Sequence, residues 1–384
     1  MVTISTEPPM TKPLAGLLVL SLDQAVAAPL TSRKLADAGA RVIKLERPEG
    51  DFARAYDSIV KGQCTHFVWL NRGKESVVAD LTKPVDKALF EAIVAKADVL
   101  VQNLKPGALA KLGFATEVLC RRHPRLICCS ISGYGDEGPY RDRKAYDLLI
   151  QAESGLASVT GGPEAPARVG ASVVDICTGM NAYEAILEAL IARGITGKGA
   201  DIRVSMFDSM MEWMAVPMLY TEYGMPPKRI GLSHPALAPY GVFTTADKVP
   251  ILISIQNDRE WAAFAAKVLG EPGLARDARF ATSPARLANR KETDAITQTC
   301  FGAQDVATLS RRLEAAEIAF ARVNEVVDVL GHPHLRRMDV DSPGGPIALP
   351  KPPARWMGAS EPGFGPLPAL GEHTDAVRRE FLGA

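Results

Sequence analysis

The chain has 384 residues, 47% of them hydrophobic and 23% charged, a composition typical of a soluble globular protein large enough for two domains. The 44 Lys and Arg residues balance the 44 Asp and Glu residues, which argues against a nucleic-acid partner because such partners usually require a basic face. No apolar run is long enough to span a membrane and the start shows no signal pattern, so we expect a cytoplasmic protein without membrane partners.

The first predicted elements alternate between strand and helix. Residues 14–46 predict a strand, a helix that ends at the C-cap glycine Gly39, and a second strand that is apolar on both faces. Further along the chain we predict a helix over 87–97, strands over 98–104 and 126–135, a helix over 179–193, and a strand passing into a helix over 201–213. This alternation predicts a parallel, doubly wound sheet.

The composition changes near residue 224. A Pro- and Gly-rich segment there is typical of a crossing between domains, and the short strands and helices over 240–325 indicate a smaller second domain. After about residue 330 the chain is again rich in Pro and Gly.

The motifs of two common cofactor sites are missing. The segment after the first strand, SLDQAVAAP, lacks the G-x-G-x-x-G fingerprint of dinucleotide-binding proteins. The six cysteines include no C-x-x-C pair, and nothing near His332 and His334 completes a metal site. We therefore expect no metal and no permanently bound cofactor.

Several polar residues follow predicted strands, where a parallel sheet binds its ligands. They are Arg47, Asn103, Lys105 and the segment 133–135. Residues 69–74 are ambiguous, because a polar turn often follows an aromatic residue.

Asp175 follows an apolar run and precedes a predicted helix. One interpretation is a helix N-cap, for which Asp is well suited. The other is a carboxylate nucleophile, which needs no general base because it ionises with an unperturbed pKa of about 3.9. Tyr146 and Asp147 stand at a second helix start, where capping is again the alternative, and Lys144 beside them is either a ligand or a solvated charge.

Taken together, these segments resemble the family III CoA-transferases, a group that also contains 2-methylacyl-CoA racemases. The resemblance covers nearly the whole chain and includes PLAGLLVLSLDQAVAAPLTSRKLADAGARVIKLERPEGD, VQNLKPGALAKLGF, SISGYGDEGPY, AYDLLIQAESGLASVTG, VGASVVDICTGMNA, ARGITGKGADIRVSMFD and LGEHTDAV. Each segment alone is weakly specific, but their joint occurrence in the family's order is strongly specific.

The resemblance implies an α/β fold with a Rossmann-like large domain built from both chain ends. Residues 1–223 would form its N-terminal part, residues 224–328 a small α+β domain with the crossing segment, and residues 329–384 the return to the large domain. Two such chains would interlock as a homodimer, each threading the ring of the other.

The resemblance also assigns residues. Asp175 falls on the family's nucleophile and Arg47 on an arginine that contacts the CoA nucleotide. The other positions that it places near CoA or the thioester are Ala27, Asn103, Leu104, Lys111, Lys144, Tyr146 and Asp147. At Lys111 some members carry arginine, so the charge is kept but the bidentate fork is lost.

Two departures bear on the reaction. Racemases of the family carry His followed by Asp where this chain has Tyr146 and Asp147, and a tyrosine with a reference pKa of about 10 is a poor substitute for an imidazole. Formyl-CoA transferases have a glycine-rich lid where this chain has Pro235 and Pro239, which argues against formate and oxalate as substrates.

We therefore expect exchange of CoA between an acyl-CoA, possibly succinyl-CoA, and a small dicarboxylic acid, through an acyl-aspartyl anhydride and an aspartyl-CoA thioester. Arg168 offers a bidentate partner for a second carboxylate, with a surface loop arginine as the alternative. His234 and Arg229 offer further donors, although a turn histidine before proline is the commoner role.

Three other functions remain open at this stage. They are a 2-methylacyl-CoA racemase, a nucleotide-dependent oxidoreductase suggested by fold alone, and a CoA-binding protein without catalysis.

Overall fold

The structure is a computed structural model that describes residues 12–355 and 363–383. The chain divides into two compact units. The first comprises Met1–Leu156, Val169–Val216 and Arg336–Ala384, and the second comprises Ala157–Arg168 and Pro217–Leu335. The short segment Ala157–Arg168, which the sequence analysis placed in the first domain, thus groups with the second unit.

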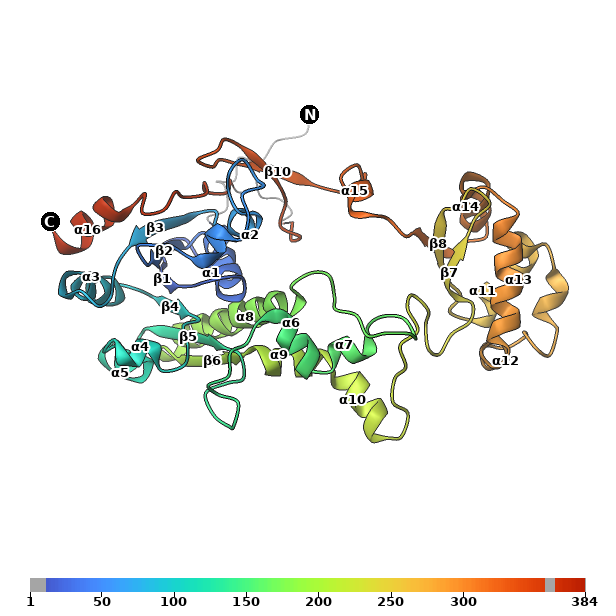
Figure 1. The fold of residues 1–384 in the computed structure, drawn as a ribbon, viewed down its shortest axis with the longest axis horizontal. Coiled ribbons are helices and arrows are strands. Elements are labelled where there is room, and N and C mark those ends of the chain that lie inside the picture. The colour runs from blue at the N-terminus through green and yellow to red at the C-terminus, as the bar shows by residue number, and fades with distance from the viewer. Residues whose placement is uncertain (1–11, 356–362, 384) are drawn as a thin grey trace, which may run out of the picture. The chain divides into compact units, whose positions relative to one another are not determined.

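The first unit is built on a six-stranded parallel sheet with the order β3-β2-β1-β4-β5-β6 (Figure 1). Its strands are β1 (Leu18–Leu22), β2 (Arg41–Glu46), β3 (Lys74–Val78), β4 (Val99–Gln102), β5 (Ile127–Ser132) and β6 (Asp201–Ser205). This is the order of the Rossmann fold, in which the chain reverses direction across the sheet between β1 and β4. Ligands of such sheets bind at that reversal, beyond the carboxyl ends of the strands.

Helices cover both faces of the sheet because successive strand residues point to opposite sides. Val19, Val42 and Val99 face α1 (Ala27–Asp37) and α8 (Val173–Thr196). Leu20, Ile43 and Leu100 face the other layer. That layer contains α3 (Pro84–Val94), α4 (Ala108–Lys111), α5 (Thr116–Arg122) and α16 (Thr374–Leu382) (Figure 1).

Shorter elements complete the first unit. They are a 3-10 helix (Phe52–Ala55), α2 (Thr65–Leu70), α6 (Asp147–Glu153), α9 (Met206–Trp213), and the hairpin of β10 (Arg337–Val340) and β11 (Ile347–Pro350). The helices α7 (Leu156–Val159) and α10 (Ala215–Glu222) lie where the chain passes between the units. The C-terminal segment returns to edge strand β3, where the backbone amide of Val78 donates to Thr374 and that of Gly371 to Ser76.

Helix α1 approaches α8 closely because Gly179 has no side chain. The Thr31 hydroxyl donates to the carbonyl of Gly179 (3.1 Å), and a Cβ built on Gly179 would lie 2.6 Å from the carbonyl oxygen of Ala27. This contact sets the position of the first turns of α8 relative to the loop that follows β1.

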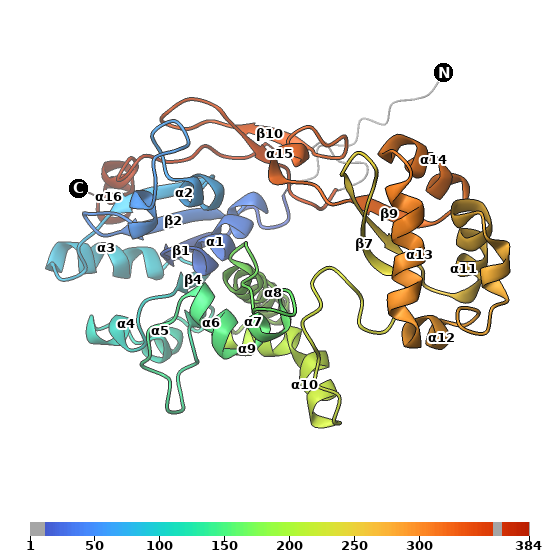
Figure 2. The same ribbon diagram turned by 45° about the vertical axis from the view of Figure 1, so that its right-hand side comes forward.

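The second unit contains an antiparallel sheet in the order β7-β8-β9, visible beside α13 and α14 in Figure 2. The strands are β7 (Tyr240–Thr244), β8 (Pro250–Ser254) and β9 (Ala319–Arg322). The helices are α11 (Asp258–Phe264), a π-helical turn (Ala265–Leu269), a 3-10 turn (Pro272–Ala275), α12 (Ser283–Ala288), α13 (Arg290–Gly302), α14 (Val306–Ala315) and α15 (Val326–Val329). The core of this unit is aromatic, with Trp261, Phe264, Phe280 and Phe301 all fully buried.

The segment 69–74, which the sequence left ambiguous, contains the end of α2, a turn at residues 72–73 and the first residue of β3. Lys74 is buried because its ammonium group is paired inside the protein, so polarity did not signal exposure. Among the described residues, none of the helices has both the length and the apolar composition needed to cross a membrane.

Candidate active site

A cavity of about 410 Å³ opens at the carboxyl ends of β1, β2 and β4. Arg47 and Leu104, both selected from sequence, line it together with the apolar side chains of Leu22, Leu45 and Leu81. Arg47 is the one cation among the described lining residues. The lining also contains the carboxylates of Asp23, Glu46, Glu49, Asp51 and Asp80. Asp23, Glu46 and Asp51 are paired with Lys44 and Arg54, so the exposed guanidinium of Arg47 is the group that can bind a phosphate.

Buried charges form the floor of this cavity. The Lys44 ammonium group donates to the side chains of Asp23 (2.5 Å) and Asp51 (2.9 Å) and to the backbone carbonyl of Asp23 (2.9 Å). Lys74 donates to the second carboxylate oxygen of Asp23 (3.1 Å). Asp51 also accepts from the backbone amide of Ala25 (3.2 Å), so these charges tie the loop after β1 to the loop after β2.

The charges in this floor compensate one another. Burial tends to raise the pKa of Asp23, but Lys44 and Lys74 outweigh it and hold that pKa below its usual range. Burial lowers the pKa of Lys74 to about 7, against the opposing attraction of Asp23. Sequence reasoning missed Asp23, Lys44 and Asp51 and left Lys74 ambiguous, because these side chains come from separate segments of the chain and their pairing leaves no local signal.

The other residues expected at CoA occupy different places. Asn103 bridges to the loop after β1, accepting from the amide of Gln24 and donating to its carbonyl, both at 2.9 Å. Ala27 is buried in the first turn of α1, against α8. Lys111 is exposed at the end of α4, whose next residue, Leu112, lines the cavity. Asn103 and Ala27 shape the loop after β1, and contact with CoA stays a prediction for both of them and for Lys111.

Asp175 lies in the first turn of α8, at the third helical residue. The expectation that it caps this helix is wrong, because the N-cap position is held by Ser172. Burial, followed by the charge of Asp147, raises the pKa of Asp175 to about 7. A partly buried carboxylate with a raised pKa is the kind of group that active sites contain.

Asp147 lies at the start of α6 and reaches the helix of Asp175. Its Oδ1 accepts from the backbone amides of Val174 (2.8 Å) and Asp175 (3.2 Å). Asp147 thus caps α8 rather than its own helix. Its neighbours Lys144 and Tyr146 are exposed, and 58% of Tyr146 is accessible.

Tyr56 connects the cavity with Asp175 electrostatically. Burial raises the pKa of Tyr56 to about 12, with further contributions from the charges of Asp51 and Asp175. Sequence reasoning missed this tyrosine, which follows the 3-10 helix in an otherwise irregular segment.

A second cleft, of about 730 Å³, lies at the carboxyl ends of β4, β5 and β6. Lys105, Tyr134 and Gly135, expected there from their places after strands, line it. The amide of Gly135 donates to the Ser132 hydroxyl (3.1 Å), so this amide is paired within its own turn.

Arg168 and His234 belong to the second unit, whereas Asp175 belongs to the first. The His234 ring stacks on Tyr240 with centroids 5.0 Å apart, and its Nδ1 accepts from the amide of Ala236 (3.1 Å). These contacts are those of a turn histidine, and a substrate contact for His234 stays a prediction. A substrate contact for Arg168 stays a prediction.

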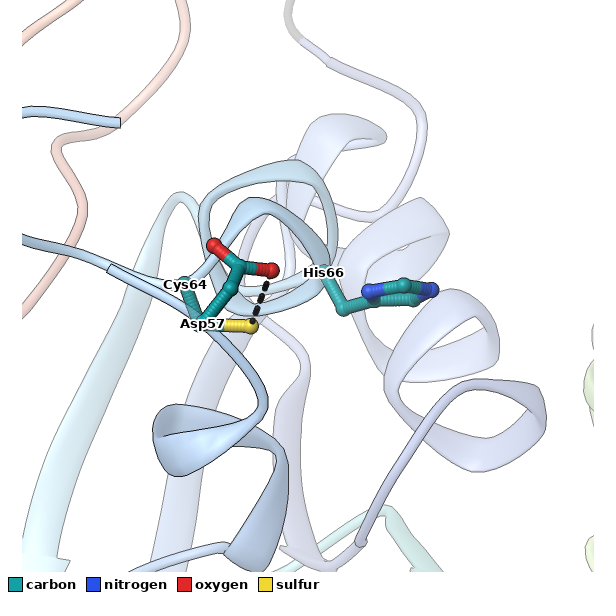
Figure 3. Close-up of side chains that lie close together, drawn as sticks. All are labelled: Asp57, Cys64 and His66. Atoms are coloured by element: carbon teal, nitrogen blue, oxygen red, sulfur yellow. Dashed lines mark hydrogen bonds between the residues drawn. The ribbon is translucent and has the colours of Figure 1, made fainter. Parts of the chain in front are cut away.

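Asp57, Cys64 and His66 bring three possible metal ligands within 4.8 Å of one another (Figure 3). Asp57 already accepts from the amides of Ile59 (3.1 Å) and Thr65 (3.0 Å), from the Thr65 hydroxyl (2.7 Å) and from the Cys64 thiol (3.5 Å). Those four hydrogen bonds occupy both carboxylate oxygens, and they explain the cluster as a cap on α2.

The first unit is thus a doubly wound α/β sheet with a cavity at its reversal point, where such sheets bind ligands. The chain matches the model of CoA-transferase family III over residues 14–374. The chain therefore belongs to CoA-transferase family III, as its resemblance indicated, and it is an enzyme of the CoA-transferase type.

Individual relatives agree with this assignment. The chain is 38% identical to acetyl-CoA:oxalate CoA-transferase of Acetobacter aceti and 34% identical to succinate–glutarate CoA-transferase of Agrobacterium fabrum, with 96% of each chain covered in both comparisons. A solved CAIB/BAIF family protein from Brucella suis is similar with a TM-score of 0.85 and 35% identity, covering 97% of this chain and 100% of that chain.

Proposed function

We propose that this enzyme transfers CoA from an acyl-CoA donor, succinyl-CoA in particular, to a small dicarboxylic acid, with Asp175 as the nucleophile. The observation that carries the proposal is a partly buried carboxylate in the first turn of α8 whose pKa is raised to about 7 by desolvation and by Asp147. The Agrobacterium fabrum relative is named for succinate and glutarate, which supports dicarboxylates. The Acetobacter aceti relative is named for oxalate, so oxalate belongs among the acceptors to be tested despite the missing glycine-rich lid.

The reaction proceeds by exchange at the carboxyl carbon. Ionised Asp175 attacks the thioester carbonyl, forming a C–O bond while the C–S bond breaks and CoA leaves as a thiolate. The thiolate then attacks the Asp175 carbonyl of this anhydride, giving an aspartyl-CoA thioester and releasing the donor acid as a carboxylate. The acceptor carboxylate repeats the two steps in reverse order, so that no ATP is required.

The cavity at the carboxyl edge of the sheet would hold the nucleotide of CoA. Arg47 supplies a guanidinium group for a phosphate, and Leu22, Leu45 and Leu104 supply apolar walls for the adenine ring. CoA thioesters are then substrates that bind reversibly, with no resident cofactor. Water must be excluded from the anhydride, because hydrolysis would discard the thioester energy.

The racemase alternative requires two acid–base groups, one on each side of the α-carbon. Where the racemases of the family carry a histidine, this chain carries Tyr146, whose phenol is exposed. Transfer of CoA is therefore favoured over racemisation as the function. Incorporation of solvent deuterium at the α-carbon of a 2-methylacyl-CoA would support the racemase instead.

The direct test is an exchange assay read by mass spectrometry. Succinyl-CoA or acetyl-CoA is incubated with oxalate, glutarate, malate, itaconate, mesaconate, citramalate and monocarboxylates of matching length. We expect new acyl-CoA products with the dicarboxylates, and hydroxylamine should trap Asp175 in the presence of donor. Asp175→Ala should abolish transfer while CoA still binds. Substantial turnover by Asp175→Ala would disprove the mechanism, and CoA binding without any exchange would identify a non-catalytic protein.

A further inference from the structure

The helix that carries Asp175 is capped from outside its own sequence. Ser172 occupies the N-cap position, but its side chain makes no capping hydrogen bond. Instead, Asp147 accepts from the amides of Val174 (2.8 Å) and Asp175 (3.2 Å). A carboxylate from α6 therefore takes up two of the amide groups that every helix leaves unpaired at its start.

The capping carboxylate is itself held in place. The fully buried Gln151, one turn further along α6, donates to the other oxygen of Asp147 (2.7 Å). The same amide side chain accepts from the backbone of Val169 (2.8 Å), in the segment that leads into α8. Gln151 thus fixes both Asp147 and the approach to Asp175.

We propose that Asp147 is a positioning residue, which orients Asp175 and strengthens its hold on a proton, rather than a residue that contacts substrate. An aspartate in the first helical turn is normally stabilised as an anion by free amides and by the helix dipole. Asp147 occupies those amides and adds a second negative charge beside the first. Both effects disfavour the ionised form of Asp175. The inference rests on the proposed role of Asp175 as nucleophile.

The other titratable groups near Asp175 do not supply this charge. Burial raises the pKa of Tyr56 to about 12. Burial is also the main cause that raises the pKa of Cys177 to about 11. Both groups are therefore neutral through the range in which Asp175 titrates. After burial itself, the charge of Asp147 is the named cause of the raised pKa of Asp175.

The chemical consequence concerns the attacking step. A carboxylate with a higher proton affinity is a stronger nucleophile, and a proton affinity close to the working pH keeps a useful share of it ionised. Attack requires the ionised form, so turnover should rise with pH as Asp175 loses its proton.

The experiment compares pH profiles of kcat/KM for wild type and Asp147→Asn. An asparagine oxygen still accepts from the two amides, but the charge is gone. We expect the acidic limb of the profile to shift to lower pH by about 1 unit or more. The KM for acyl-CoA should stay within about twofold, because Asp147 would not touch substrate. Asp147→Ser, which is uncharged and too short to reach α8, provides a second uncharged variant if the asparagine disturbs Gln151.

Glu153→Gln is the matched control. It removes one negative charge from the same helix, but Glu153 pairs with Arg143 and has no hydrogen bond to α8. Its profile should coincide with that of wild type. An unshifted profile in folded Asp147→Asn and Asp147→Ser would overturn the inference, as would a large rise in KM for acyl-CoA without a shift. If wild type shows no exchange at any pH, the proposed function itself fails.

Discussion

At the scale of single residues, the proposed nucleophile Asp175 should also affect the stability of the fold. Burial and the charge of Asp147 raise its pKa from 3.8 in the unfolded chain to about 7 in the folded protein. The folded state therefore binds this proton more tightly than the unfolded state. The resulting contribution to stability is complete below about pH 3.8 and is lost as the pH rises through about 7.

Asp175→Asn should remove this dependence, because an amide does not titrate. The variant should gain stability relative to wild type as the pH rises from about 4 to about 7, and the difference should then stay constant. The rise in the pKa of Asp175 on folding corresponds to at most roughly 4 kcal/mol in the free energy of unfolding, since each pKa unit is worth about 1.4 kcal/mol. Thermal unfolding of both proteins at a series of pH values measures it. Melting temperatures that differ by the same amount at every pH would contradict the assignment.

The importance of Asp175 could be inferred from its sequence context, but its proton affinity could not. The local pattern suggested an ordinary N-cap or an aspartate that ionises near its usual pKa. The raised pKa depends first on burial and then on the charge of Asp147, which the fold brings from another helix. The buried ion pairs of Lys44 and Lys74 could not be inferred from sequence for the same reason. Their acidic partner, Asp23, comes from the segment after β1, far from both lysines along the chain.

At the scale of elements, the contact between α1 and α8 should control where Asp175 lies. A Cβ on Gly179 would approach the carbonyl oxygen of Ala27 to 2.6 Å, too close for any real contact. Gly179→Ala should therefore push α8 away from α1, at a cost of roughly 1–3 kcal/mol in the free energy of unfolding. Since Asp175 lies one turn earlier on α8, we also expect kcat to fall by about tenfold or more. Denaturant unfolding and exchange kinetics measure the two effects.

Gly194 provides the control within the same helix. A Cβ on Gly194 would meet no atom within 4 Å, so alanine there removes backbone freedom without a clash. Gly194→Ala should be neutral or slightly stabilising, with unchanged kcat. Equal effects of the two substitutions would show that the close approach at Gly179 does not position the active site.

Most elements near the sheet could be predicted from apolar pattern and glycine placement. The first strand, its helix and the second strand appear where residues 14–46 predicted them, and Gly39 follows the end of α1 with a positive φ of 106°. The pattern failed at β3, because a lysine and a glutamate occupy its first positions. The sequence pattern also placed residues 157–168 in the first domain, whereas they belong to the second unit. Which unit a segment joins depends on its tertiary contacts, and composition does not reveal these.

At the scale of the whole molecule, the exposed apolar side chains suggest that the chain described here is one part of an assembly. On α8, Ile191 and Ile195 follow one another by one turn and expose 68% and 83% of their surfaces. Large exposed apolar patches usually mark interaction surfaces. They support the proposed homodimer, whose interlocked form is implied by the family resemblance.

We expect light scattering after gel filtration to give twice the mass of one chain at micromolar and lower concentrations. Interlocked chains cannot separate without unfolding, so mixing tagged and untagged dimers should give no mixed species in the folded state. Refolding the same mixture from denaturant should give mixed dimers. Rapid exchange without denaturant would disprove interlocking but keep the dimer, whereas a monomeric mass would disprove both. The substitution Ile195→Lys should impair assembly during refolding. The control Val85→Lys, on α3 across the sheet, tests whether any added surface charge has that effect.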